Sequence, residues 1–90
     1  MIDDTLQDRV RKIINRHDPV GLLKMGAPTD EYDSELKRII PLLSEVGSRD
    51  ELHEKVYQLF VEMFRPATVG SKAQYAGLSE ELYQLSRIKP

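Results

Sequence analysis

The chain contains no cysteine. This absence excludes disulfides, thiolate zinc sites, iron–sulfur clusters and cysteine nucleophiles together. It also lacks long apolar runs, since no stretch approaches the roughly 20 residues that a membrane-spanning helix needs. The first residues, "MIDDTLQDRVRKII", are charged and amphipathic and have no apolar segment of the kind found in signal peptides. These absences predict a cytoplasmic protein with no membrane contact.

An excess of positive charge is missing as well. The sequence has 13 basic and 15 acidic residues, a formal net charge of -2, whereas nucleic-acid-binding proteins usually carry a basic excess. Nor does it contain a phosphate-binding glycine loop, a Gly-x-Ser-x-Gly elbow or a plausible catalytic triad. We therefore expect no nucleic-acid partner, no cofactor and no enzymatic activity.

What is present is the composition of an ordinary small globular protein. The chain has 90 residues, of which 40% are hydrophobic and 31% charged, and this predicts one helical domain over residues 1–90. A domain of this size buries only about 60% of the surface that its unfolded chain exposes. The core should be thin, and a deep enclosed pocket is not expected.

Apolar side chains recur at helical spacing in four segments, and no segment alternates with the period of a strand. The segments lie between residues 5 and 17, 32 and 47, 48 and 66, and 71 and 85. A capping box of Ser48 and Glu51 begins the third helix, and "RPATVGSK" is predicted to be a loop. Pro41 falls opposite the centre of an apolar face, so we predict one kinked helix there.

The first connection is long and carries many special residues: "HDPVGLLKMGAPTDEYDSEL", residues 17–36. Asp18 and Pro19 end one helix and start a short helical turn over Pro19–Met25. Gly26 closes that turn in a left-handed conformation, and Pro28 keeps the next residues extended. Four side chains are expected to pin the turn to the core: Val20, Leu22, Leu23 and Met25. The predicted fold class is therefore all-α, a small four-helix up-and-down bundle with one extra short helical turn and a long first connection.

The acidic run "DEYDSE" supplies the candidate site. Asp33 suits the start of the following helix, because a negative charge is favourable at a helix amino terminus. That role leaves Asp30, Glu31 and Tyr32 without a backbone explanation, and we predict that these three residues form an interaction site. Tyr32 is also interpreted as the residue that anchors the long connection.

A metal site is the alternative interpretation of this stretch. The chain has two histidines, His17 and His53, which are too far apart in sequence to form a helical pair of ligands. A spatial cluster of histidine and carboxylates could still bind a metal or perform acid–base chemistry. The residues of this hypothesis are His17, Asp18, Asp30, Glu31 and Asp33.

The stretch also carries a resemblance. Asp18, Pro19, Gly21 and Leu22, followed by "GAPTDEYD" over residues 26–33, resemble the signature of the YugE-like family of small uncharacterised bacterial helical proteins, a domain of unknown function. The resemblance implies a four-helix fold and implies no activity.

Two classes of function remain open from the sequence. The first is a protein-interaction or regulatory module with an unknown protein partner. The second is a small metal-binding protein or enzyme that uses the 17–33 stretch. Either is compatible with a monomer or a weak homodimer.

Overall fold

The computed structural model describes residues 6–28, 30–64 and 66–87. These residues form an all-α structure with no strand. The elements are α1 (Leu6–His17), α2 (Asp33–Glu45), α3 (Arg49–Met63), α4 (Pro66–Val69), a 3₁₀ turn (Lys72–Tyr75) and α5 (Ala76–Arg87). The predicted fold class is confirmed, because four long helices make a small bundle. None of the described helices combines the length and the apolar character that crossing a membrane would require.

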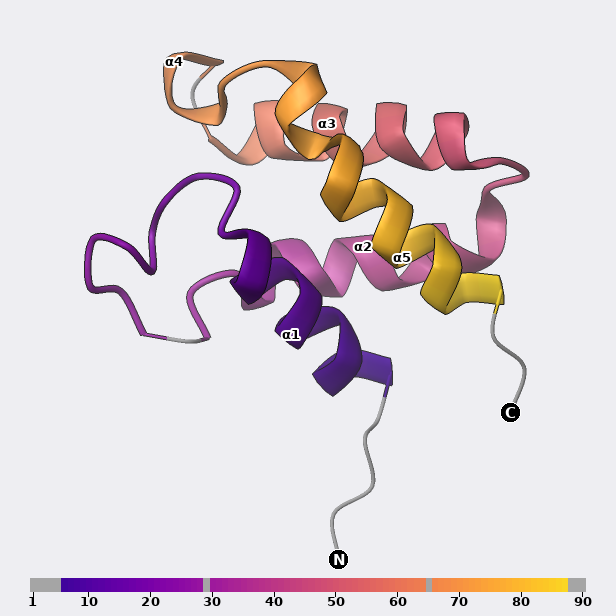
Figure 1. Cartoon of the computed structure of the whole chain (residues 1–90), viewed down its shortest axis with the longest axis horizontal. Helices are drawn as coiled ribbons and strands as arrows, with labels where there is room; N and C mark the ends of the chain where they lie inside the picture. Colours follow the sequence, from indigo (N-terminus) through magenta and orange to yellow (C-terminus); the bar gives the residue numbers. More distant parts are fainter. Residues whose placement is uncertain (1–5, 29, 65, 88–90) are drawn as a thin grey trace, which may run out of the picture.

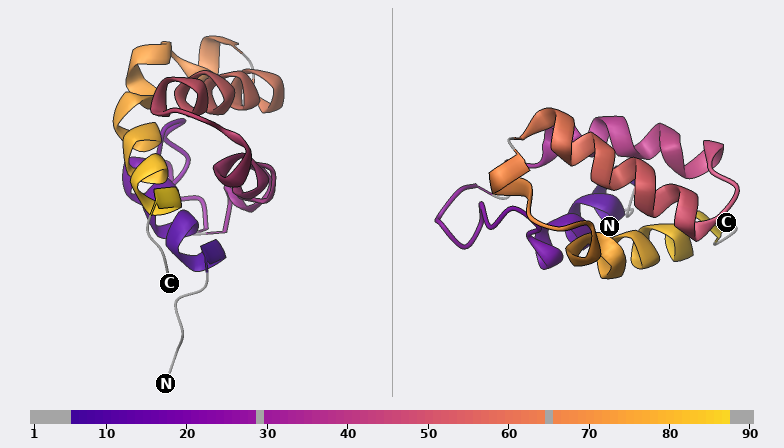
Figure 2. Two further views of the ribbon diagram at one scale, coloured as in Figure 1. Left: turned by 90° about the vertical axis from the view of Figure 1, so that its right-hand side faces the viewer. Right: turned by 90° about the horizontal axis from the view of Figure 1, so that it is seen from above.

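The four long helices close into a ring of neighbours. Helix α1 contacts α2 and α5, and α3 contacts the same two helices from the other side. Figure 1 shows α2 and α3 side by side along the molecule, with α1 and α5 crossing them obliquely. The connection between α1 and α2 projects at one end of the bundle, as both Figure 1 and the right view of Figure 2 show.

The core is one cluster of apolar side chains drawn from every long helix. Phe60 of α3 lies in its middle, with its ring centroid 6.2 Å from that of Tyr32 and 5.2 Å from that of Tyr75. Both tyrosines are almost completely buried. The other fully buried members are Val10, Ile14, Leu36, Ile39, Leu52, Val56, Val69, Leu78 and Leu82.

Local signals set most helix ends. The Ser48 hydroxyl accepts a hydrogen bond from the backbone N–H of Glu51 at 3.1 Å, as the capping box predicts. The Glu51 carboxylate reaches back one residue further than expected, to the N–H of Gly47 at 2.8 Å. Helix α2 runs through Pro41 as a single helix, because a proline on the outer side costs only one backbone hydrogen bond. The predicted start of the first helix at Thr5 lies outside the described residues.

The prediction for residues 65–72 was wrong in one respect. The expected loop contains the four-residue helix α4, and the 3₁₀ turn follows it before α5. Within that turn, Gln74 accepts a hydrogen bond from the backbone N–H of Ser71 at 3.1 Å. The Tyr75 hydroxyl donates to the carbonyl of Val69 at 2.9 Å. The Tyr75 ring packs against Phe60 and its hydroxyl binds Val69, so this side chain holds the end of α4 against the bundle.

Candidate interaction site

The long connection is anchored at its base by Asp18 and Tyr32. The Tyr32 hydroxyl donates a hydrogen bond to Asp18 Oδ1 at 2.7 Å and accepts one from the N–H of Val20 at 3.1 Å. The Asp18 carboxylate also accepts the backbone N–H groups of Leu23 and Lys24, each at 3.0 Å. One carboxylate thus ties the two ends of the loop to its middle. We call residues 18–32 the anchored loop.

Asp18 also ends helix α1. Its N–H still donates to the carbonyl of Ile14 at 2.7 Å, and its φ angle of 45° turns the chain into the left-handed region. Aspartate is one of the few residues other than glycine that tolerate this conformation. The helix therefore ends because Asp18 adopts a left-handed cap, with Pro19 preventing continuation.

The predicted turn at Pro19–Met25 is present as a single hydrogen-bonded turn and not as a helix. The N–H of Ala27 donates to the carbonyl of Leu22 at 3.0 Å, and that of Gly26 donates to Leu23 at 2.9 Å. This pair of bonds is the Schellman motif, with Gly26 in the left-handed position at a φ of 97°. The predicted role of Gly26 is confirmed.

The ionisation of the two anchors follows from these contacts. Burial acts to raise the pKa of Asp18, but the hydrogen bonds from Leu23, Tyr32 and Lys24 outweigh it, so the pKa lies below its ordinary value. Burial, reinforced by the bond to Asp18, raises the pKa of Tyr32. At neutral pH the pair is therefore a neutral phenol that donates to a charged carboxylate, which is a strong form of hydrogen bond.

An ion pair joins α1 to the start of α2, where the loop ends. Arg11 of α1 forms a forked contact with Asp33, in which Nε lies 3.0 Å from Oδ1 and Nη2 lies 3.0 Å from Oδ2. The Arg11 guanidinium lowers the pKa of Asp33 by this hydrogen bond. Asp33 is the first residue of α2, so this fork fixes the direction of the chain as it leaves the loop.

The three residues of the predicted interaction site lie in two different environments. Tyr32 is only 1% exposed and serves as the anchor, so its side chain is not available to a partner. Asp30 and Glu31 are exposed at the carboxyl end of the loop. Met25, which the sequence placed in the core, is instead 73% exposed. The large side chain that the loop exposes to solvent is therefore Met25 and not Tyr32.

The two histidines serve contacts between helices. His17 Nε2 lies 2.6 Å from Oε2 of Glu81, which joins the end of α1 to α5. The His17 ring packs over Gly77, where an added Cβ would approach its Cε1 to 3.2 Å. His53 Nε2 lies 2.7 Å from the carbonyl of Lys72. Each histidine therefore already has a hydrogen-bonding partner within the fold.

The carboxylates of the metal hypothesis do not converge on a common point. Asp18 binds loop amides, Asp33 binds Arg11, and Asp30 and Glu31 face outward. In the part of the chain that the structure describes, no group of three or more histidine and acidic side chains is placed to hold a metal ion. The anchored loop consequently has no described arrangement suited to metal chemistry.

Glu35 is a buried carboxylate beside the loop. It is 5% exposed, and its Oε1 has no hydrogen-bond partner among the described residues. Burial raises the pKa of Glu35, and the carboxylates of Glu31 and Asp33 raise it further against the effect of its own backbone N–H. When ionised, this side chain therefore destabilises the fold.

We predict that Glu35→Met will raise the free energy of unfolding at pH 7 by about 1 kcal/mol. The gain should shrink as the pH falls through the raised pKa of Glu35, because the native carboxyl then becomes neutral. Urea denaturation at neutral and acidic pH measures both effects. Glu45→Met, at an exposed position, is the matched control and should change stability by less than about 0.5 kcal/mol. A loss of stability in Glu35→Met would contradict the prediction.

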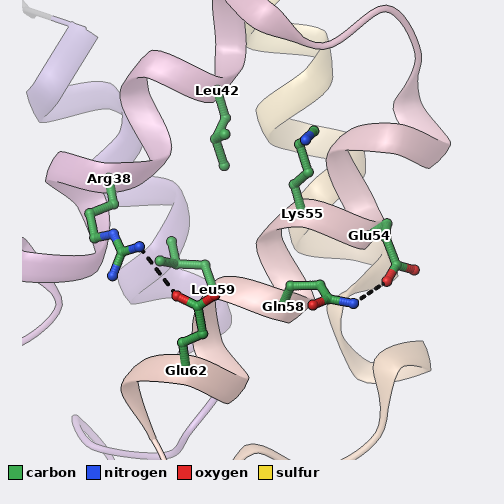
Figure 3. Close-up of a pocket in the computed structure, with 7 residues that line it drawn as sticks. All are labelled: Arg38, Leu42, Glu54, Lys55, Gln58, Leu59 and Glu62. Carbon is green, nitrogen blue, oxygen red and sulfur yellow. Dashed lines mark hydrogen bonds and ion pairs between the residues drawn. The ribbon is translucent and has the colours of Figure 1, made fainter.

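A shallow groove of about 360 Å³ lies between α2 and α3. Figure 3 shows Leu42 and Leu59 in it, with polar side chains around them. Arg38 donates to Glu62 at 3.2 Å, and the other rim holds a similar pair, Gln58 to Glu54 at 2.6 Å. Four polar groups of the rim are thus paired with one another, and Lys55 completes the lining of the groove.

Comparison with known proteins does not assign the site. No protein-family model, no curated protein and no solved structure matches the chain. The similarity to the YugE-like family therefore stays a prediction from the residues 18–33 that carry it.

Proposed function

We propose that the protein is a small protein-interaction or regulatory module without catalytic activity, and that it contacts its partner through the anchored loop. One observation carries the proposal. Met25 is held 73% exposed on a loop whose base is closed by the 2.7 Å hydrogen bond between Tyr32 and Asp18. A loop that is positioned by a rigid scaffold is a common place for binding residues.

The anchoring lowers the cost of binding. A flexible loop loses conformational freedom when it binds, and preorganisation removes part of that cost. Here the Asp18 carboxylate and the turn at Gly26 already fix the backbone on both sides of Met25. Methionine adapts its shape readily to an apolar pocket, and it is frequent on surfaces that bind proteins.

The exposed charges of the loop define the chemistry of the partner. Lys24 precedes Met25, while Asp30 and Glu31 lie at the other end of the loop. The fitting partner is a protein surface with an apolar pocket for the methionine, an acidic group near Lys24 and a basic group opposite the two carboxylates. Opposite charges placed in this way favour one orientation and speed association.

Site-specific photo-cross-linking tests this proposal. A photoreactive amino acid at position 24, in cells that normally make the protein, should give one discrete adduct with a partner protein. The same amino acid at position 37, which is exposed on α2, is the matched control and should give none. Adding Met25→Asp to the position-24 protein should abolish the adduct, because a buried unpaired carboxylate is costly at an interface.

Two outcomes contradict the proposal. One is the absence of any adduct from position 24. The other is an adduct that survives both Met25→Asp and a double change of Asp30 and Glu31 to lysine. Each variant is first checked for an unchanged melting temperature, so that a lost adduct reports on contact and not on unfolding.

The proposal includes a cytoplasmic location, the bacterial YugE-like kinship and a monomeric or weakly dimeric state. The resemblance in residues 18–33 supports the kinship, and the composition supports the location. Cell fractionation tests the location, and sedimentation over a range of protein concentrations tests the oligomeric state.

A further inference from the structure

We infer that Met25 is a site of reversible oxidation by hydrogen peroxide, and that its sulfoxide removes the apolar contact of the anchored loop while leaving the fold intact. The part of this inference that concerns partner binding rests on the proposed function. The oxidation site itself does not, since it follows from the exposure of Met25 and from the contacts that hold the loop.

Accessibility separates Met25 from Met63. Met25 is 73% exposed, whereas Met63 at the end of α3 is partly buried and packs against the core. Oxidants reach an exposed thioether more readily than one that is covered by other side chains. Met25 should therefore react several-fold faster than Met63. Met1 lies outside the described residues, and a peptide map reads its oxidation separately.

The reaction transfers one oxygen atom. The O–O bond of hydrogen peroxide breaks, the sulfur of Met25 gains an oxygen and loses two electrons, and the peroxide is reduced to water. The product is methionine sulfoxide, which is polar and chiral, and methionine sulfoxide reductases reverse the change. A side chain suited to an apolar pocket thereby becomes one that carries a strong hydrogen-bond acceptor.

The fold does not depend on the Met25 side chain. The loop is pinned to the core by Val20, Leu22 and Leu23, and Met25 takes no part in that packing. The backbone N–H of Met25 donates to the carbonyl of Leu22 at 3.1 Å, a bond that oxidation of the side chain leaves in place. Oxidation should consequently change the surface of the loop and not its conformation.

The experiment treats the purified full-length protein with hydrogen peroxide and follows each methionine by mass spectrometry of proteolytic peptides. We expect Met25 to be oxidised several-fold faster than Met63, with the melting temperature changed by less than about 3 °C. Met25→Leu is the control, because it keeps an apolar side chain and cannot form the sulfoxide. Oxidation of Met63 at an equal rate would overturn the inference, as would a large fall in melting temperature that Met25→Leu prevents.

The consequence for binding is tested with the position-24 cross-linker. The purified protein, oxidised or untreated, is added to a lysate and illuminated. Loss of the adduct on oxidation, its return after treatment with a sulfoxide reductase and its persistence in oxidised Met25→Leu support the inference. An adduct unchanged by oxidation of Met25 overturns the binding consequence. If the untreated protein gives no adduct, the proposed function fails, while the peptide map still decides the oxidation site.

Discussion

Replacing Tyr32 with alanine is expected to lower the free energy of unfolding by about 3–5 kcal/mol, the range for removal of a large buried aromatic side chain. The ring is 1% exposed and lies against Phe60, with centroids 6.2 Å apart. Its hydroxyl also holds Asp18 and the N–H of Val20. The substitution therefore opens a cavity and releases the base of the loop in one step. Urea denaturation at neutral pH measures the loss.

Tyr32→Phe separates the ring from the hydroxyl. It keeps the packing against Phe60 but leaves Asp18 without one donor, and it should cost about 1–2 kcal/mol. Tyr83→Ala is the matched control: this tyrosine is half-buried beside Arg87, so its loss should be clearly smaller than that of Tyr32→Ala. Equal losses in Tyr32→Ala and Tyr83→Ala would refute the anchoring role of Tyr32.

Replacing Asp18 is expected to have the second largest effect. Its carboxylate accepts three hydrogen bonds, from the N–H groups of Leu23 and Lys24 and from the Tyr32 hydroxyl. Asp18→Gly removes the carboxylate but tolerates the φ angle of 45°, and we expect it to cost about 2 kcal/mol. Asp18→Ala should cost about 1 kcal/mol more, because alanine resists the left-handed conformation. The difference between the two variants separates the carboxylate from the backbone.

Hydrogen exchange locates this effect. In Asp18→Gly the amides of Leu23 and Lys24 should exchange faster, while the amides in the middle of α3 should keep exchanging only through global unfolding. Asp30→Ala, at an exposed position in the same loop, is the control and should change stability by less than about 0.5 kcal/mol. Unchanged exchange at Leu23 and Lys24 would show that the carboxylate does not hold the loop.

The free energy of unfolding at acidic pH provides an independent test of the role of the Asp18 carboxylate. Its pKa is lower in the folded protein than its ordinary value of 3.8. The stabilisation is therefore fully present well above 3.8 and is lost as the pH falls through the lowered pKa of the folded state. Asp33, whose pKa is lowered by Arg11, also loses its stabilising effect in this acidic pH range, and it does so equally in the wild type and in Asp18→Gly. The wild type should thus lose more stability on acidification than Asp18→Gly does.

Two of the variants, Tyr32→Phe and Met25→Asp, also test how the loop binds its partner. If the anchored loop keeps this conformation when it binds its partner, Tyr32→Phe should weaken binding through loss of preorganisation without changing any exposed side chain. Met25→Asp should do the reverse, since it changes the exposed surface and leaves the anchor in place. The two variants therefore distinguish a loop that binds because it is rigid from one that binds through its surface alone.

Sequence reasoning was reliable where the cause was local. The period of apolar residues predicted the four long helices, and capping chemistry predicted the start of α3 at Ser48. The left-handed turn at Gly26 was predicted from its place after an apolar stretch. Sequence reasoning failed for α4, because a segment of about one turn is too short to carry a periodic signal and forms only when the fold supports it.

The candidate site was harder to predict than the fold. The sequence singled out residues 17–36 as unusual, since the acidic residues there exceed what capping requires. It could not say that Tyr32 turns inward and Met25 outward, because both are side chains that proteins place in the core or on the surface. The three donors that converge on Asp18 come from residues 5, 6 and 14 positions further along the chain, and no local sequence rule predicts these pairings.

By itself, then, the sequence determined the all-α class, the long helices, the helix end at Asp18 and Pro19 and the left-handed turn at Gly26. These features depend on neighbours within a few residues. The tertiary structure decided which side chains the loop shows and which it buries. Arg11 meets Asp33 and His17 meets Glu81 across sequence separations of 22 and 64 residues. Such pairings arise only when helices pack, so the residues near each partner in the sequence do not predict them.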